Sequence, residues 1–368
     1  VEQLKQSEIL HCLQLLHCHL GSQIPNIRSI RSGVLEACRF YSGLVEEGAP
    51  MGFLDLGGGL AVDYEGARTN SHHSMNYQLD EYCANIVETI CECLDPLVIP
   101  HPVIVSESGR STVAYSSMLL FNVLDVRDHR PVPLPDSLPE NSHEMVQNLW
   151  QVNRVMTADN FQECYNDALF YRDEVRELFR RGQASLSDRA IADNITLAVL
   201  EKVAAALKQT SKHYPELNNL PEMLADTYYG NFSLFQSLPD VWAIDQVFPV
   251  MPIHRLQEEP DRDAVVADIT CDCDGKIDHF SSAKGIKRTT RLHTLREGEE
   301  YYLGVFLVGA YQETLGDLHN LFGDTNVVSV HINADGSYDF VREFHGDSIA
   351  DVLSYVEYDT KIMTEEFR

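Results

Sequence analysis

The chain has 368 residues, 44% of them hydrophobic and 23% charged, which is enough apolar material for a large core and for two or more domains. Its 56 acidic and 28 basic side chains give a formal net charge of −28, which argues against nucleic acid as a partner. No apolar run approaches the roughly 18 residues of a membrane span, and the first ten residues lack the features of a secretory signal, so we expect a cytoplasmic protein with no membrane partner.

From residue 13 to about residue 126, short apolar runs alternate with helical patterns. Strands separated by helices indicate parallel βαβ units, whose candidate chemistry lies at the carboxyl ends of the strands. Because a complete (β/α)8 TIM barrel needs roughly 250 residues, we assign residues 1–130 to the C-terminal half of such a barrel. The expected strands and helices lie at residues 13–20, 26–46, 52–60, 77–94 and 102–109.

Residues 131–220 are expected to form a linker and an inserted helical bundle. The stretch "RPVPLPDSLPE" contains four prolines and is typical of a linker. Three helical patterns follow, at about 142–156, 158–181 and 188–209, and Ser187 with Asp188 offers a cap for the third. Short connections between them favour an antiparallel bundle.

Residues 221–368 are expected to form a β-rich, barrel-like domain with a terminal helix. The runs "AVVADITCDCDG", "EYYLGVFLVGAYQ" and "NVVSVHINADGSYDFVREF" are typical of strands, and Asp335-Gly336 predicts a hairpin turn within the last. The stretch "DSIADVLSYV" predicts an amphipathic helix. The fold class is therefore α/β plus all-β, with a partial barrel, a bundle and a β domain.

Two histidines mark the end of the first apolar run. His17 and His19 flank Cys18, so on a strand both imidazoles face the same side. Paired histidines can bind zinc, which raises a metal hydrolase as one alternative, but a well-placed carboxylate and further histidines are missing from the pattern. A single histidine lying flat against a ring cofactor needs fewer coincidences, and His19, two residues before Gly21, is the better candidate.

The next two apolar runs end in a glycine loop and an acid. Gly57, Gly58 and Gly59 permit close backbone approach, and their N–H groups can hold a phosphate, although a simple tight turn explains them equally well. Glu107 follows an apolar run that we expect to be a buried strand, and a buried carboxylate there can hold the pyridine nitrogen of pyridoxal phosphate protonated. Arg110 could then contact the phosphate, and the alternative is an internal ion pair between Glu107 and Arg110.

Seven stretches together resemble the biosynthetic arginine decarboxylase family, pyridoxal phosphate enzymes of the alanine racemase-like barrel superfamily. They are "HCHLGSQ", "DLGGGLAVDYEG", "SMNYQLDEY", "SESGR", "YGNFSLFQSLPDVWAIDQVFPVMPIHR", "TCDCDG" and "GAYQETLGDLHNLFGD". The resemblance implies a (β/α)8 barrel, a bundle inserted after it and a C-terminal β domain. It also implies decarboxylation of L-arginine to agmatine and CO2 on the route to putrescine and spermidine, with Mg2+ as a further cofactor.

The resemblance implies a role for individual cofactor-binding residues. His19 matches the histidine stacked on the cofactor ring, and Glu107 matches the partner of the pyridine nitrogen. The residues that match contacts to the cofactor phosphate are Ser22, Gly58, Gly59, Gly109, Arg110 and Tyr311.

The resemblance also implies a substrate side. Cys271 matches the cysteine that returns a proton after CO2 departs, and Asp272 matches the acid that holds the distal cationic group. Asp274 and Asp245 are further candidates for that acid. In this superfamily the cysteine loop reaches the cofactor of the partner subunit, so a homodimer or higher homo-oligomer with shared active sites is implied.

One departure from the family is large, because the lysine that holds the cofactor on an early barrel strand has no counterpart here. Of the eight lysines only Lys5 precedes the helical insert, and it stands in the polar stretch "VEQLKQSE". We therefore expect a fragment that is inactive alone. The alternative is a non-catalytic homologue that acts as a binding or regulatory subunit, against which the presence of His19, Glu107, Cys271 and Asp272 argues.

Overall fold

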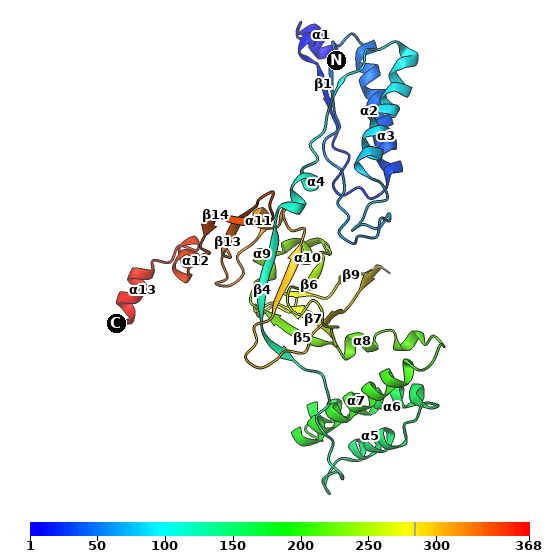
Figure 1. Ribbon diagram of the computed structural model, residues 1–368, viewed down its shortest axis with the longest axis vertical. Coiled ribbons are helices and arrows are strands. Elements are labelled where there is room, and N and C mark those ends of the chain that lie inside the picture. Colours follow the sequence, from blue (N-terminus) through cyan, green and yellow to red (C-terminus); the bar gives the residue numbers. More distant parts are fainter. Residues whose placement is uncertain (283–284) are drawn as a thin grey trace.

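The computed structural model describes residues 1–282 and 285–368. In Figure 1 an α/β part at the N-terminus lies at one end of the molecule and a helical bundle at the other, with a large β sheet between them. The partial barrel, the bundle and the β domain expected from the sequence are all present. Among the described residues, none of the helices has the length and apolar character that crossing a membrane requires.

The N-terminal part is a parallel three-stranded sheet, β1-β2-β3, covered by two helices. Each strand has three residues and is followed directly by a loop that carries candidate residues. Helix α2 begins after Asn26, whose side chain accepts a hydrogen bond from the backbone N–H of Arg28. The bounds confirm the predicted order: β1 (Leu15–His17), α2 (Ile27–Glu46), β2 (Phe53–Asp55), α3 (Leu79–Leu94) and β3 (Val103–Val105).

The described residues cover one face of this sheet and leave the other exposed. Leu16 and Leu54 pack against the buried faces of α2 and α3. On the opposite face Leu15, Phe53 and Val103 stand side by side in register and are 45%, 40% and 57% exposed. The expectation that the apolar run before Glu107 is buried is therefore wrong for this chain, because no element among the described residues covers that face.

The bundle consists of α5 (Glu144–Val155), α6 (Phe161–Arg180) and α7 (Leu186–Leu207), which confirms the three predicted helices. Their apolar stripes form a core of their own around Leu149, Ala168 and Val199. The cap of α7 differs from the prediction, since Ser185 and Asp188 form a reciprocal capping box and the helix begins two residues earlier.

A seven-stranded sheet forms the β domain, with the order β11-β7-β5-β4-β12-β6 and β8 paired to β7. Its core includes Phe121, Tyr228 and Leu303. Strand β4 precedes the bundle in sequence but pairs with β5 and β12, which follow it. Its strands are β4 (Met118–Arg127), β5 (Asp226–Gly230), β6 (Val250–Pro252), β7 (Arg262–Ala267), β8 (Lys276–Ile277), β11 (Thr290–Leu292) and β12 (Tyr302–Phe306).

The predicted hairpin and terminal helix are both present, as β13 (Val327–Ile332), β14 (Tyr338–Phe344) and α12 (Ile349–Tyr355). Gly336 in the turn has φ +85°, which favours glycine. The other elements are α1 (Glu2–Gln6), α4 (Gly109–Val113), α8 (Leu220–Met223), α9 (Leu234–Ser237), α10 (Pro239–Ile244), β9 (Phe280–Ser282), β10 (Gly285–Lys287), α11 (Gln312–Leu315) and α13 (Thr360–Phe367).

Candidate functional site

The glycine loop after β2 lies against His19. The backbone N–H of Gly58 donates to Nδ1 of His19 at 3.1 Å, so in the neutral imidazole the proton is on Nε2. A Cβ on Gly58 would come within 3.0 Å of Cε1 of His19, and one on Gly57 within 2.7 Å of Nδ1. Glycine is therefore required here for close approach to the imidazole, which goes beyond a simple tight turn.

Arg110 gathers several predicted residues around a buried positive charge. Its side chain lies on α4 and is 8% exposed. Nε donates to Oγ of Ser22 at 3.3 Å, and Cζ lies 4.8 Å from the ring centroid of Tyr311. Nη1 donates to the hydroxyl of Tyr64 at 3.0 Å. We call Ser22, Tyr64, Arg110 and Tyr311 the Arg110 cluster.

The Arg110 cluster has the properties of an anion site. Within the described part of the chain Arg110 has no carboxylate within 4.0 Å, so the ion pair with Glu107 that the sequence left open is not formed. A buried guanidinium with only neutral partners is costly, and an incoming phosphate would supply the missing charge in bidentate form. The structure thus brings Ser22, Arg110 and Tyr311 together, as the sequence predicts.

Tyr64 is a member of the cluster that the sequence did not single out. It is fully buried, and burial raises the pKa of its hydroxyl although the neighbouring Arg110 opposes the shift. The phenol therefore stays neutral and can both accept from Arg110 and donate to an anion. Its position in "DYEG", a few residues after the glycine loop, was the only available signal.

Tyr311 is held in a strained backbone conformation. It precedes α11 with φ +69°, a region that residues with a side chain rarely adopt. Such a conformation costs on the order of 1–3 kcal/mol and persists at functional sites where the surroundings enforce it. In this conformation the ring of Tyr311 lies 4.8 Å from Cζ of Arg110.

Glu107 lies at the third strand end, beside His17 and Asp55. Its backbone N–H donates to the carbonyl of Gly57 at 2.8 Å. One side-chain ligand atom from each of His17, Asp55 and Glu107 lies within 4.8 Å of the others, and Nδ1 of His17 is 2.8 Å from Oδ2 of Asp55. The argument that a metal hydrolase lacks a well-placed carboxylate is thus wrong, because Asp55 and Glu107 provide two. Further histidines are still missing from the group.

Both carboxylate oxygens of Asp55 are held by hydrogen bonds. Its Oδ1 accepts the backbone N–H of Gly57 at 2.9 Å. Burial alone would raise its pKa, but the hydrogen bonds from Gly57 and His17 outweigh that effect and the pKa of Asp55 is lowered. The Asp55 side chain is therefore a carboxylate at neutral pH.

The four predicted substrate-side residues stand on other loops than the group formed by His19, the glycine loop, Glu107 and the Arg110 cluster, which we call the cradle. Sγ of Cys271 accepts a hydrogen bond from Nδ2 of Asn320, and Asp274 donates its backbone N–H to Asp272. Asp245 ends α10 in a left-handed conformation. No hydrogen bond or ion pair between described residues connects Cys271, Asp272, Asp274 or Asp245 to His19 or Glu107.

Asp272 lines a hollow of about 280 Å³ between α9, α10 and α11. Asp240 and Asp317 supply two more carboxylates, and the walls include the rings of Phe235, Trp242 and His319. Carboxylates and aromatic faces together suit an organic cation. Asp240 accepts a hydrogen bond from Gln312, the residue after Tyr311, so the hollow adjoins the Arg110 cluster. Neither Asp274 nor Asp245 lines it.

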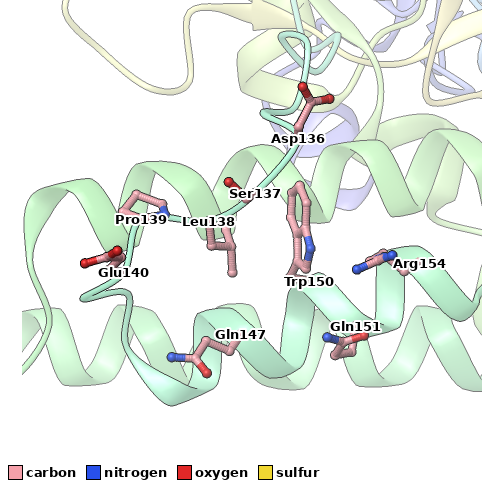
Figure 2. Close-up of a pocket in the computed structure, with 9 residues that line it drawn as sticks. All are labelled: Asp136, Ser137, Leu138, Pro139, Glu140, Gln147, Trp150, Gln151 and Arg154. Carbon is pink, nitrogen blue, oxygen red and sulfur yellow. The ribbon is translucent and has the colours of Figure 1, made fainter.

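Another hollow, of about 350 Å³, lies on the bundle between the linker segment 136–140 and α5 (Figure 2). Trp150 and Arg154 face it from α5, together with Gln147 and Gln151. None of the predicted site residues lines this hollow, so we do not connect it with the chemistry of the strand ends.

The lysines that the structure describes lie away from the cradle. Lys5 pairs with Glu47 at 2.7 Å, and Lys202 donates to Asn153 in the bundle. Lys284 lies outside the described residues. Among the described residues, no lysine contacts His19, Glu107 or the Arg110 cluster.

Comparison with known proteins matches two families. Residues 1–114 match the pyridoxal binding domain of pyridoxal-dependent decarboxylases, and residues 139–221 match the arginine decarboxylase helical bundle domain. Biosynthetic arginine decarboxylase from Gloeobacter violaceus is 44% identical over 372 residues, which cover 100% of this chain and 58% of that protein. The enzyme from Phocaeicola vulgatus is 44% identical over 97% of this chain and 57% of its own length. The chain thus spans a little under three fifths of these relatives.

Solved structures agree. The crystal structure of biosynthetic arginine decarboxylase from Campylobacter jejuni is similar with a TM-score of 0.83 and 32% identity, covering 100% of this chain and 59% of that one. Diaminopimelate decarboxylase from Helicobacter pylori has a TM-score of 0.53 at 13% identity, over 96% of this chain and 59% of its own, and shows the fold alone.

Proposed function

We propose that this chain, which is similar along its whole length to the biosynthetic arginine decarboxylases, acts in the pyridoxal phosphate-dependent conversion of L-arginine to agmatine and CO2. This reaction would supply putrescine and spermidine synthesis. The observation that carries the proposal is the buried guanidinium of Arg110, whose hydrogen-bond partners among the described residues are the neutral hydroxyls of Ser22 and Tyr64; Ser22 follows His19 by three residues. Such a site favours an anionic ligand, and the phosphate of pyridoxal phosphate would balance its charge.

The residues of the cradle fit pyridoxal phosphate. When bound, the cofactor supplies a protonated ring that takes up the electrons of the broken carbon–carbon bond. His19, fixed by the N–H of Gly58, would lie against one ring face, and Glu107 would hold the proton at the ring nitrogen. The phosphate would be held by Ser22, Gly58, Gly59, Gly109, Arg110 and Tyr311.

The substrate side rests on the hollow between α9 and α11. Asp272 would bind the guanidinium of arginine, because it shares the hollow with two other carboxylates and three aromatic rings. Asp274 and Asp245 are weaker candidates, since neither lines it. Cys271 is exposed and would return the proton to the substrate carbon, in the cofactor site of a partner copy within a homodimer or higher homo-oligomer. The Mg2+ that the resemblance implies has no assigned ligands.

Activity also needs a lysine that the described residues do not provide. We propose that a polypeptide segment carrying that lysine completes the barrel at the uncovered face of β1, β2 and β3. The apolar row of Leu15, Phe53 and Val103 on that face, and the unpaired outer edges of β1 and β3 among the described residues, support this. The isolated chain is then inactive.

The experiment is to join the lysine-bearing N-terminal part of the Gloeobacter violaceus relative to this chain and measure agmatine formed from L-arginine. The isolated 368-residue chain and the joined protein with Arg110→Gln serve as controls. The proposal is supported if the joined protein forms agmatine and neither control does. A joined protein that folds and binds pyridoxal phosphate but releases no agmatine favours a non-catalytic binding or regulatory subunit instead.

A further inference from the structure

His17 and Asp55 are joined by a hydrogen bond, and neither residue has a role in the proposed reaction. Strand register places His17 opposite Asp55 and Asp55 opposite Val105, and Glu107 follows Val105 by two residues. Residues two apart on an extended segment face the same side. The three side chains therefore meet at neighbouring strand ends, which agrees with their mutual separation of at most 4.8 Å.

The group combines two carboxyl side chains with one imidazole. Asp55 is a carboxylate at neutral pH, because its hydrogen bonds from Gly57 and His17 lower its pKa against the effect of burial. Glu107 is a second carboxylate nearby, and like charges at this separation repel one another. The other titratable side chains at this end of β1 are Cys18 and His19, and His19 is engaged with Gly58. His17 is the group that bonds directly to Asp55.

We propose that His17 is a positioning residue for Glu107. By holding Asp55 through its hydrogen bond, it keeps that carboxylate engaged and leaves Glu107 turned toward the ring nitrogen of the cofactor. This inference depends on the proposed function, because it concerns how the cradle holds pyridoxal phosphate. Without His17, Asp55 faces Glu107 directly, and Glu107 either turns away or loses its charge. Asp55 then weakens cofactor binding, and removing its charge should restore the affinity that is lost with His17.

The test measures binding of pyridoxamine 5′-phosphate to the 368-residue chain by ligand fluorescence, since this form of the cofactor needs no lysine. The variants are His17→Gln, Asp55→Asn and the two combined, and asparagine at 55 keeps an oxygen for the N–H of Gly57. We expect His17→Gln to weaken binding about tenfold and the double variant to bind within about threefold of the wild type. The absorption of the bound ring should report the same recovery of nitrogen protonation.

A matched pair outside the cradle is the control. His101 and Asp95 lie 2.6 Å apart on the surface, so His101→Gln and Asp95→Asn should leave binding unchanged. His17→Ala, which removes the hydrogen bond to Asp55, should bind as weakly as His17→Gln and serves if the latter misfolds. In a Glu107→Gln background, His17→Gln should have no further effect.

Two outcomes would overturn the inference while leaving the cofactor site intact: wild-type affinity in His17→Gln, or a double variant that binds no better than His17→Gln. A wild-type chain that binds no pyridoxamine 5′-phosphate would instead remove the proposed cofactor site, and the inference with it.

Discussion

Replacing Arg110 by glutamine should weaken phosphate binding while leaving the fold about as stable as before. In the cofactor-free chain the buried guanidinium bonds to two neutral hydroxyls, those of Ser22 and Tyr64. Each neutral bond contributes about 1 kcal/mol, whereas desolvating an unpaired charge costs several. Glutamine can keep one of these bonds, so the free energy of unfolding should fall by less than about 1 kcal/mol, or rise. A hydrogen bond to a charged phosphate contributes about 1.5–3 kcal/mol, so affinity should drop about 10- to 150-fold.

Arg262 provides the matched control, because it is a half-buried arginine that does have a counter-ion. It binds Asp226 through two hydrogen bonds of 2.6 and 2.9 Å, and Asp226 is 2% exposed. Arg262→Gln leaves that carboxylate buried and unpaired, which should cost about 3–5 kcal/mol of stability without touching the cradle.

Urea unfolding followed by circular dichroism, together with fluorescence titration of pyridoxamine 5′-phosphate, measures both quantities for the two variants. The reasoning predicts opposite patterns: lost affinity with retained stability at Arg110, and lost stability at Arg262. If Arg110→Gln is destabilised as strongly as Arg262→Gln, or binds the ligand as tightly as the wild type, the buried charge of Arg110 does not mark an anion site.

Three further predictions follow from named contacts. Gly58→Ala should lower the free energy of unfolding by about 1–2 kcal/mol and weaken ligand binding, because its Cβ would press on His19. Gly43→Ala on α2, with open space around it, should instead raise the free energy of unfolding by about 0.5–1 kcal/mol. Urea unfolding measures both changes. Folding lowers the pKa of Asp55, so its contribution to stability is present above about pH 4 and is lost as the pH falls further. The free energies of unfolding of the wild type and of Asp55→Asn should therefore converge in acid. A difference between the two that stays constant with pH would contradict this. In the joined enzyme Asp272→Asn should raise KM for arginine about tenfold with a smaller change in kcat, and Asp274→Asn, outside the hollow, should change KM less.

Much of the fold follows from local sequence. The 3.6-residue pattern places α2, α3, α5, α6 and α7 correctly, because each helix buries one stripe against neighbours that are close in sequence. The start of α7 is the exception, since two serines stand near it and only Ser185 has the spacing to Asp188 that closes a capping box.

Site residues can be predicted where the local sequence requires one residue type. Contacts that depend on the register between two strands cannot be predicted in this way. The three consecutive glycines and His19 are visible in the sequence as candidates, because each follows an apolar run that predicts a strand. The contact of His17 with Asp55 depends on the pairing of β1 with β2, which spacing along one strand does not give. Tyr64 reaches Arg110 through an irregular loop, for which the sequence offers no period.

Burial of the strand before Glu107 could not be predicted for a different reason. The apolar residues Val103 and Ile104 suit an interior position, but burial also requires elements on both sides of the sheet. On the described residues the helices cover one side only. Composition therefore indicates where a surface ought to be covered, and not what covers it.

The pairing of β4 with β5 has a consequence for the bundle. Arg127 and Thr227 are direct cross-strand neighbours, so the chain leaves the sheet and returns to it at the same place. The roughly one hundred residues between them thus occupy the position of a hairpin loop, where insertions of any length cost little closure entropy. A short turn in their place would leave every ladder bond of the two strands intact, which makes the bundle a detachable module.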